Sequence, residues 1–330
     1  MFSVSKKVGI DLGTTTILVY VEGKGVVFNE PSVVSINKEN NKVLAIGEEA
    51  KKMLGKTPSS IVAVKPMKDG VIADYDIIES MLKFYINKIY GRWTFFPPYL
   101  MICVPTTATS VERRAIKRCA LRIGCKKVFL IEEPKAAAIG ANIDIAIPEG
   151  NMIIDVGGGT TDIAVLSLGK IVVGESLRVG SNEFDEAIQR YMRKCYNLAI
   201  GDNTAESIKQ KIGYAIFPSE NEEMEVKGRD LVSGLPRKIK IRAEEICKTL
   251  SESLSSITEG VKIVLEKTPP ELAADIINKG IVMTGGGSLL KNFDRLIEKT
   301  TSITTCLADD PSTCVVIGAG RALQSIELLK

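Results

Sequence analysis

Three short turns rich in glycine and threonine are the part of the sequence best suited to chemistry. They are DLGTTT (residues 11–16), DVGGGTTD (155–162) and TGGGS (284–288), and each follows an apolar run. Glycine lets backbone N–H groups approach an anion because no Cβ stands in the way. Successive N–H groups and threonine hydroxyls then form a cradle for phosphate oxygens. The three turns therefore predict a site that holds phosphate groups.

An aspartate opens each of the first two turns. If these turns grip phosphates from opposite sides, Asp11 and Asp155 face each other across them. Such a carboxylate pair suits Mg²⁺, which keeps several waters and binds through few protein oxygens. One D-x-G turn alone is most often a simple hairpin, whereas two copies and the third turn together favour nucleotide binding. The chain has no G-x-x-x-x-G-K-[ST] P-loop, and no G-x-G-x-x-G stands between a first strand and helix.

The same succession of elements surrounds both aspartate turns. An apolar strand precedes each turn and a predicted hairpin follows it, at 17–28 in the first case and 163–173 in the second. This repetition predicts a duplicated domain and an α/β fold. The other predicted strands are 33–36, 43–46, 99–104, 128–131 and 281–283, and the predicted helices are 76–90, 109–123, 182–198, 204–212, 242–266 and one starting near 311–313.

Two further segments carry local signals. The polar stretch 218–238 is expected to hold short strands and turns. The pair Pro269-Pro270 is expected to break the long helix that precedes it.

Composition excludes several classes of function. The 330 residues include no histidine, so a Ser-His or Cys-His catalytic pair and a histidine-based metal site are ruled out. The seven cysteines form no C-x-x-C pair, which favours buried free thiols over disulfides or a metal cluster. A net charge of +3 implies no strong attraction to nucleic acid. The N-terminus is too short and polar for a signal peptide, and no apolar run is long enough to span a membrane.

The glycine turns resemble the two phosphate motifs and the adenosine motif of the actin, heat-shock chaperone and hexokinase superfamily. Within it, the chain is similar to the MreB family of bacterial actins, from residue 8 to the C-terminal helix. The segments that carry this closer resemblance are MICVP (101–105), VERRA (111–115), IEEP (131–134), AAAIGA (136–141), TAE (204–206) and IK (208–209). The chain departs from the family at TTI (15–17), where Ala-Asn-Thr is usual, and this bears on its contacts with the β-phosphate.

The resemblance implies a role for each matched residue. Glu133 matches the residue that orients or activates the attacking water, and Thr160 matches the hydroxyl that helps to hold it. Asp11 and Asp155 match the carboxylates around the phosphates and around Mg²⁺, which they would hold through water. The remaining residues implied to bind nucleotide are Gly13, Thr14, Thr15, Gly157, Gly158, Gly159, Thr161, Gly285, Gly286, Gly287 and Ser288, with Glu206 and Lys209 near the ribose and base.

Residue type alone favours a simpler interpretation of Glu133. A glutamate in the first turn of a helix stabilises the helix dipole, as Glu132 would also do. The catalytic role rests on the resemblance, together with the position of this carboxylate at a strand-to-helix junction. From there it can point into a cleft, where phosphoryl transfer to water needs positioning more than covalent help.

The resemblance also implies an α/β, actin-like, two-lobed ATPase fold, with a duplicated RNase H-like core, a cleft between the lobes and two smaller insertion subdomains. The first lobe would span 1–145, with an insertion at about 31–74 and the C-terminal helix 310–330. The second would span 146–309, with an insertion at about 180–245.

The implied function is slow ATP hydrolysis coupled to assembly, with ATP or ADP and Mg²⁺ as ligands. The protein would form paired, membrane-associated filaments that control cell shape, on the inner face of the cytoplasmic membrane. Other morphogenesis or cytoskeletal proteins would be its partners, and no nucleic acid is expected among them.

One aromatic segment is a candidate for membrane contact. Trp93, Phe95 and Phe96 lie between a predicted helix and strand, next to Pro97-Pro98, which favours an exposed loop. Aromatic side chains flanked by basic residues suit insertion at an anionic interface, and the family carries an apolar membrane-binding loop in this region. Ordinary packing of these rings beneath a loop is an equally good interpretation.

Three related functions stay open on the sequence. A heat-shock-type chaperone would need a peptide-binding domain after the ATPase part. A small-molecule kinase would need a catalytic aspartate in the first lobe and a substrate pocket, for which no convincing candidate is evident. A plasmid-partitioning or membrane-adaptor relative of actin would differ more in its insertions.

Overall fold

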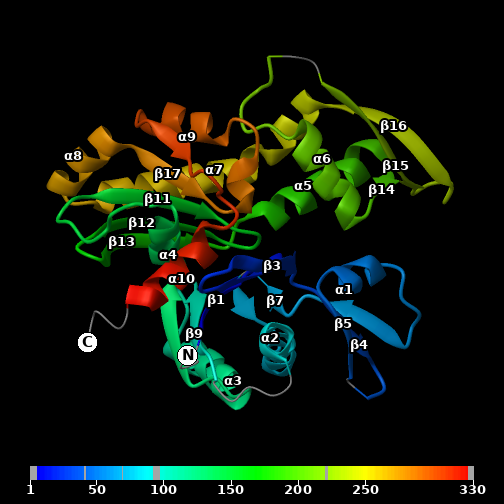
Figure 1. Ribbon diagram of the computed structural model, residues 1–330. Coiled ribbons are helices and arrows are strands. Elements are labelled where there is room, and N and C mark those ends of the chain that lie inside the picture. The colour runs from blue at the N-terminus through cyan, green and yellow to red at the C-terminus, as the bar shows by residue number, and fades with distance from the viewer. Residues whose placement is uncertain (1–5, 41, 69, 92–96, 220–221, 326–330) are drawn as a thin grey trace.

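A computed structural model describes residues 6–40, 42–68, 70–91, 97–219 and 222–325. Two five-stranded sheets form the centre of the molecule, one in each of two lobes (Figure 1). The strands of the first sheet, in spatial order, are β10 (Lys127–Glu132), β9 (Tyr99–Val104), β1 (Lys7–Leu12), β2 (Thr16–Val21) and β3 (Gly25–Pro31). Those of the second are β13 (Lys170–Leu177), β12 (Thr161–Ser167), β11 (Asn151–Val156), β17 (Ile281–Thr284) and β18 (Thr305–Leu307).

The two sheets have one topology. In the first, β1 pairs antiparallel with β2 and parallel with β9, while β2–β3 is antiparallel and β9–β10 parallel. In the second, β11 pairs antiparallel with β12 and parallel with β17, while β12–β13 is antiparallel and β17–β18 parallel. The duplicated α/β core expected from the sequence is therefore confirmed, with the first two glycine turns at equivalent places.

Two short helices lie between the sheets. They are α4 (Glu133–Gly140) and α10 (Cys314–Ser325), which pack against each other (Figure 1). A Cβ at Gly140 would lie 1.8 Å from the carbonyl oxygen of Cys314, and one at Gly318 would lie 1.8 Å from that of Ala136. Only glycine allows this close approach. The segment that leads into α10 lies against the third turn, where the N–H of Gly285 donates to the carbonyl of Pro311 at 2.8 Å.

Successive residues of a strand point to opposite faces of the central sheet, and each face packs against a different set of helices. In β11, Ile153 belongs to the buried cluster around α4 and α10, whereas Met152 and Ile154 belong to the cluster beneath the outer helices. A strand covered on both faces is largely apolar, and the interior strands β11 and β12 are buried along their whole length, with polar residues confined to their ends. The outer helices are α2 (Tyr75–Tyr90) and α3 (Ser110–Arg122) in the first lobe and α7 (Ala243–Lys267), α8 (Pro270–Lys279) and α9 (Phe293–Thr301) in the second.

Each lobe carries a smaller sheet, inserted between the third and fourth strands of its central sheet in chain order. The first-lobe insertion comprises β4 (Val34–Asn37), β5 (Val43–Ile46), α1 (Glu48–Met53), β6 (Ile61–Val64), β7 (Met67–Lys68) and β8 (Val71–Ile72). The second-lobe insertion comprises α5 (Ser181–Tyr196), β14 (Leu198–Ala199), α6 (Asp202–Ile212), β15 (Glu223–Asp230) and β16 (Pro236–Arg242). The domain boundaries drawn from the sequence stay predictions.

Every predicted strand and helix has a counterpart, but some elements were not foreseen. The segment 218–238 contributes to a hairpin whose strands, β15 and β16, are longer than expected, because each alternates exposed residues with partly or fully buried ones. Pro270 does end the long helix region, yet it also starts α8, since proline is compatible with a first helical turn. The elements that were not predicted are α1, α9, the 3₁₀ turn η1 (Gly286–Leu289) and the short strands β6 to β8, β14 and β18.

All seven cysteines are free, as expected, although Cys195 and Cys306 are exposed rather than buried. Within the described parts of the chain, no helix is both long and apolar enough to cross a membrane.

Candidate functional site

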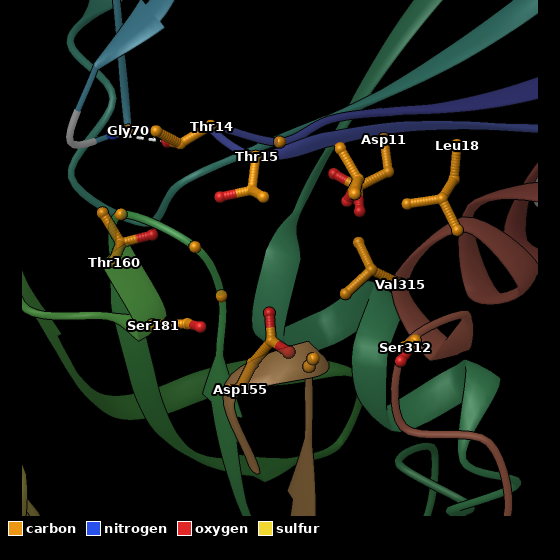
Figure 2. Close-up of a pocket in the computed structure, with 18 of the residues that line it drawn as sticks. Asp11, Thr14, Thr15, Leu18, Gly70, Asp155, Thr160, Ser181, Ser312 and Val315 are labelled. Carbon is orange, nitrogen blue, oxygen red and sulfur yellow. Dashed lines mark hydrogen bonds between the residues drawn. The ribbon is translucent and has the colours of Figure 1, made fainter. Parts of the chain in front are cut away.

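A cavity of about 470 Å³ opens where the two lobes meet, and all three glycine turns line it (Figure 2). Asp11 and Thr15 enter it from the first lobe, and Asp155 and Thr160 from the second (Figure 2). The predicted site residues that line the cavity are Asp11, Gly13, Thr14, Thr15, Glu133, Asp155, Gly157, Gly158, Gly159, Thr160, Glu206, Lys209, Gly285, Gly286 and Gly287.

Two predicted site residues do not line this cavity. The Thr161 hydroxyl donates to the carbonyl of Val179 at 2.7 Å, and the Ser288 hydroxyl donates to the carbonyl of Gly285 at 2.7 Å. Both side chains are buried. Their hydroxyls therefore hold the turns in shape from behind.

The first turn is held by the insertion of its own lobe. A Cβ at Gly13 would lie 2.7 Å from the carbonyl oxygen of Thr16, so the turn closes too tightly for any other residue. The buried Thr14 hydroxyl accepts a hydrogen bond from the backbone N–H of Gly70 at 3.2 Å (Figure 2). Gly70 lies between β7 and β8, so that hairpin is fixed to the turn.

The second turn is joined to the start of α5. The backbone N–H of Gly157 donates to Thr160, and those of Ser181 and Asn182 donate to the carbonyls of Gly157 and Gly158, at 3.0 and 2.8 Å. The first turn of a helix is the positive end of its dipole, which favours a nearby anion. Ser181, the first residue of α5, itself lines the cavity.

The third turn is fixed to the second. Thr284 ends β17, and its hydroxyl donates to the Asp155 carboxylate at 2.9 Å. Gly285 has φ of 82°, a conformation that favours glycine, and a Cβ there would lie 2.3 Å from the carbonyl oxygen of Val156. Turns two and three therefore form one rigid wall of the cavity.

Carboxyl groups dominate the electrostatics of the site. Burial raises the pKa of Asp11 to about 7 and that of Asp155 to about 8, the latter also through the charges of Asp162 and Asp11. Burial and the same group of acids raise the pKa of Glu133 well above its ordinary value. Several carboxylates in one desolvated cleft repel one another, so the site favours a bound cation. Oxygen donors of this kind are those that Mg²⁺ prefers.

Neighbouring glutamates at the start of α4 have different surroundings. Glu132 forms an ion pair with Arg113 at 3.0 Å. Glu133 lines the cavity between the two aspartate turns. Its position therefore agrees better with a role in the cleft than with the helix-dipole role that residue type alone favours.

Lys209 and Glu206 lie on one face of α6, at the mouth of the cavity. The Lys209 ammonium donates to the Asp185 carboxylate at 2.8 Å and to the hydroxyl and carbonyl of Ser181 at 2.6 and 3.1 Å. An ammonium group has three donors, so these contacts use all of them. Glu206 forms an ion pair at 3.5 Å with Lys51 of α1, which belongs to the other lobe.

Comparison with known proteins agrees with this geometry. Residues 5–330 match the family described as MreB/Mbl protein. The cell shape-determining protein Mbl of Bacillus cereus is 50% identical over 326 residues, which cover 98% of each chain. The chain belongs to the MreB/Mbl family. The cell shape-determining protein MreB of Escherichia coli is 48% identical, with 98% of this chain and 95% of that one covered.

Among solved structures, MreB5 of Spiroplasma citri bound to AMPPNP superimposes with a TM-score of 0.93 at 41% identity, covering 98% of both chains. The MreB/Mbl chain described here therefore has the actin-like fold that its motifs predict.

Several cavity residues of this MreB/Mbl protein were not predicted from the sequence. Two of them, Leu12 and Thr16, belong to the first glycine turn itself. The others lie outside the three turns and reach the cavity only in the folded chain. They are Leu18, Met67, Gly70, Ser181, Gln210, Leu289, Leu290, Ser312 and Val315. The nearest signal was the position of Leu289 and Leu290 directly after the third turn.

The predicted membrane segment lies outside the described residues. Trp93, Phe95 and Phe96 fall within 92–96, between α2 and β9. Their role stays a prediction from the sequence and from the MreB resemblance.

Proposed function

We propose that this protein binds ATP with Mg²⁺ between its lobes, hydrolyses the ATP slowly, and assembles into membrane-associated filaments that control cell shape. The observation that carries the proposal is the convergence of three glycine turns and the carboxyl groups of Asp11, Glu133 and Asp155 on one cavity. The curated relatives are cell shape-determining proteins, and a related MreB5 binds AMPPNP.

The donor set of the cavity fits Mg²⁺. Asp11 and Asp155 supply oxygen atoms only, and burial raises the pKa of both carboxyl groups, that of Asp155 also through the charges of Asp162 and Asp11. Among the residues that the structure describes, no three Cys, Asp or Glu side chains form a metal-binding group. This suits an ion held mainly by phosphates and water, with the two aspartates bonding to its waters. When bound, Mg²⁺ would neutralise charge on the phosphates.

Each lobe supplies a different part of the chemistry in this proposal. Backbone N–H groups of the first two turns would hold the phosphates from opposite sides, at 13–15 and 158–159. Glu133, from the first lobe, would orient the attacking water, and Thr160, from the second, would hold it by its hydroxyl. Phosphoryl transfer depends chiefly on such positioning and on charge stabilisation. Closure of the lobes would therefore complete the site.

The base would occupy the side of the cavity away from the carboxylates. Leu289 and Leu290 follow the third turn and line this wall, and Gly285 to Gly287 would allow the adenosine to approach the backbone. Glu206 would contact the ribose or base. Lys209 would act by fixing α6 to α5, because its donors are already engaged.

Assembly would couple the nucleotide to the subunit surface. Filaments, arranged in pairs, would form by contacts between identical subunits, and their membrane contact would come from Trp93, Phe95 and Phe96 on the inner face of the cytoplasmic membrane. Partner proteins would belong to the machinery of cell morphogenesis. Lobe closure around nucleotide is the step through which ATP would favour assembly.

Sedimentation of the purified protein tests both parts of the proposal. We expect it to pellet with Mg²⁺ and ATP, less with ADP, and to co-sediment with anionic liposomes. Trp93→Ser with Phe95→Ser should abolish co-sedimentation while ATP-dependent pelleting persists. Phe217→Ser, which removes an exposed aromatic ring elsewhere in the chain, is the matched control and should behave as the wild type.

One outcome would contradict the filament. If the protein binds ATP but stays in the supernatant at every concentration, it does not polymerise. Faster ATP consumption on addition of a sugar or an acid would then favour the kinase alternative.

A further inference from the structure

One hydrogen bond joins the first glycine turn to the start of α5 across the cleft. The hydroxyl of Thr15, in the first lobe, donates to the side-chain carbonyl of Asn182, in the second, at 2.9 Å. Thr15 lines the cavity, whereas Asn182 lies just behind the second turn and has no role in the site described so far. Both residues are partly buried, so the bond is shielded from water on several sides.

Both ends of this bond are held by backbone contacts. The carbonyl of Thr15 accepts the N–H of Ser32 at 2.8 Å, which fixes the first turn to the end of β3. The N–H of Asn182 donates to the carbonyl of Gly158 at 2.8 Å, which fixes α5 to the second turn. A bond between two anchored groups costs little side-chain entropy and therefore retains more of its free energy.

Gly158 makes room for the contact. A Cβ at this position would lie 2.0 Å from the Thr15 hydroxyl oxygen and 2.7 Å from its Cβ. Any larger residue would force Thr15 away from Asn182. The absence of a side chain at Gly158 therefore lets the opposite lobe, as well as a phosphate, come close to the second turn.

The chemistry of a hydroxyl limits what else Thr15 can do. A threonine side chain has one proton to donate, and here that proton points to Asn182. A phosphate oxygen carries no proton at neutral pH in its ionised form, so it would compete with Asn182 for the same donor. The backbone N–H of Thr15 is not subject to this competition.

Two other polar contacts cross between the lobes at different depths. Near the base of the cleft, the N–H of Thr106 donates to the Asp162 carboxylate at 3.3 Å. At the mouth, Lys51 pairs with Glu206 at 3.5 Å. The Thr15–Asn182 bond links the first turn to the start of α5, which is itself bonded to the second turn, so it acts on the spacing between the two turns.

We propose that Thr15 and Asn182 form a clasp that holds the two phosphate turns together whether or not a γ-phosphate is bound. Asn182 is the positioning residue: it keeps the Thr15 hydroxyl engaged, and Thr15 meets phosphate through its backbone N–H. The clasp rests on the proposed nucleotide function. The clasp should affect the two nucleotides differently. The γ-phosphate of ATP can bridge the two turns by itself, whereas bound ADP has no γ-phosphate and depends on the clasp to hold the turns together. The clasp therefore strengthens ADP binding more than ATP binding.

Equilibrium binding of ADP and AMPPNP to three variants tests the clasp. Thr15→Val keeps the shape but removes the donor, Asn182→Ala removes the acceptor, and Thr15→Ser keeps the donor. We expect each of the first two to weaken ADP binding about fivefold, the effect of one lost hydrogen bond, and to weaken AMPPNP binding about twofold or less. Thr15→Ser should bind both nucleotides as the wild type does.

The double variant separates a clasp from two independent effects. If Thr15 and Asn182 act through one bond, Thr15→Val with Asn182→Ala should weaken ADP binding no more than either change alone. Glu186→Ala, an exposed change one turn further along α5, is the control and should leave both affinities unchanged. Circular dichroism and thermal melting of each variant exclude misfolding.

Three outcomes would overturn the clasp: Thr15→Ser behaves like Thr15→Val, the effects of the single changes multiply in the double variant, or both nucleotides are weakened equally. Failure of the proposed function looks different, because the wild type would then bind neither ADP nor AMPPNP. A wild type that binds both, with variants that do the same, overturns the clasp alone.

Discussion

The two lobes share one sheet topology, but they hold their insertions in different ways. In the second lobe, buried residues of the insertion, such as Ile208, Val226 and Ile241, belong to the same cluster as the strands of the central sheet. In the first lobe, one face of the small sheet joins the main core through Val34 and Ile46. Its other face rests on α1 through a small cluster of three buried residues, namely Val33, Ala45 and Ala50, with Met53, Leu54 and Ala63 partly buried against them.

The second-lobe insertion is therefore a firmly packed wall of the cleft, whereas the first-lobe insertion is a weakly packed one. Stability gained from burial grows with apolar area, so α1 is held to its sheet by far less than α6 is held to the second lobe. Helix α1 carries Lys51, which meets Glu206 across the mouth. We therefore expect the first-lobe insertion to open first, while the second keeps the nucleotide wall in place.

The largest effect should come from the core of the second-lobe insertion. Ile241→Ala removes a fully buried side chain from the shared cluster and should lower the free energy of unfolding by about 3 kcal/mol. Val33→Ala should change global unfolding by about 1 kcal/mol or less, but it should speed hydrogen exchange in 34–46. Denaturant unfolding and hydrogen exchange measure the two quantities. Equal losses of global stability would remove the distinction between the insertions.

The next largest effect should come from Glu133, the residue that the first lobe supplies to the proposed hydrolysis. Glu133→Gln keeps the shape of the side chain but removes the carboxylate that orients water, so hydrolysis should fall about 100-fold, which is about 2.7 kcal/mol in activation free energy. Nucleotide affinity should change little. Phosphate release under single-turnover conditions measures the rate. Glu132→Gln is the matched control, since its partner is Arg113, and a similar loss there would contradict the assignment.

The two cleft aspartates predict a pH dependence of stability in the nucleotide-free protein. Their pKa values rise from the ordinary 3.8 to about 7 for Asp11 and about 8 for Asp155 on folding. A raised pKa means that the folded state binds the proton more tightly. Stability is therefore greatest below about pH 4 for this contribution, and it is lost as pH rises through 7 or 8.

Asp155→Asn removes this loss and keeps an acceptor for Thr284, so it should raise Tm at pH 8.5 by about 3 °C. The gain should shrink as the pH is lowered to 5.5. Asp11→Asn should behave alike, with its gain complete about one pH unit lower. Melting curves at both pH values test this, and a gain that grows on acidification would have the wrong sign.

The smallest effect should come from the ion pair at the mouth. Exposed pairs contribute about 1 kcal/mol or less, so Lys51→Ala should speed ADP release about two- to threefold at low salt and less at high salt. Lys52→Ala, on the same helix, is the control. Stopped-flow release of a fluorescent ADP analogue measures the rate. Identical release rates for the two variants would show that the ion pair does not restrain the first-lobe insertion.

The sequence determined most of the central architecture. Glycine turns after apolar strands, repeated in two halves, were sufficient to predict the duplicated core, because apolar periodicity and turn chemistry are local properties. They also brought Asp11, Asp155 and the third turn to one predicted site, and all of them line one cavity. What the pattern could not give was α1 or the short strands β6 to β8, which are too brief to show a period.

Tertiary structure decided which way individual side chains point. Thr160 and Thr161 are neighbours in one turn, yet one lines the cavity and the other bonds to Val179, because successive residues of extended backbone face opposite sides. Glu132 and Glu133 are also neighbours, yet Glu132 pairs with Arg113 whereas Glu133 lines the cleft. Contacts across the lobes, such as Thr15 with Asn182, join residues far apart in the chain. No local pattern can specify them, since they depend on how α4 and α10 set the two sheets against each other.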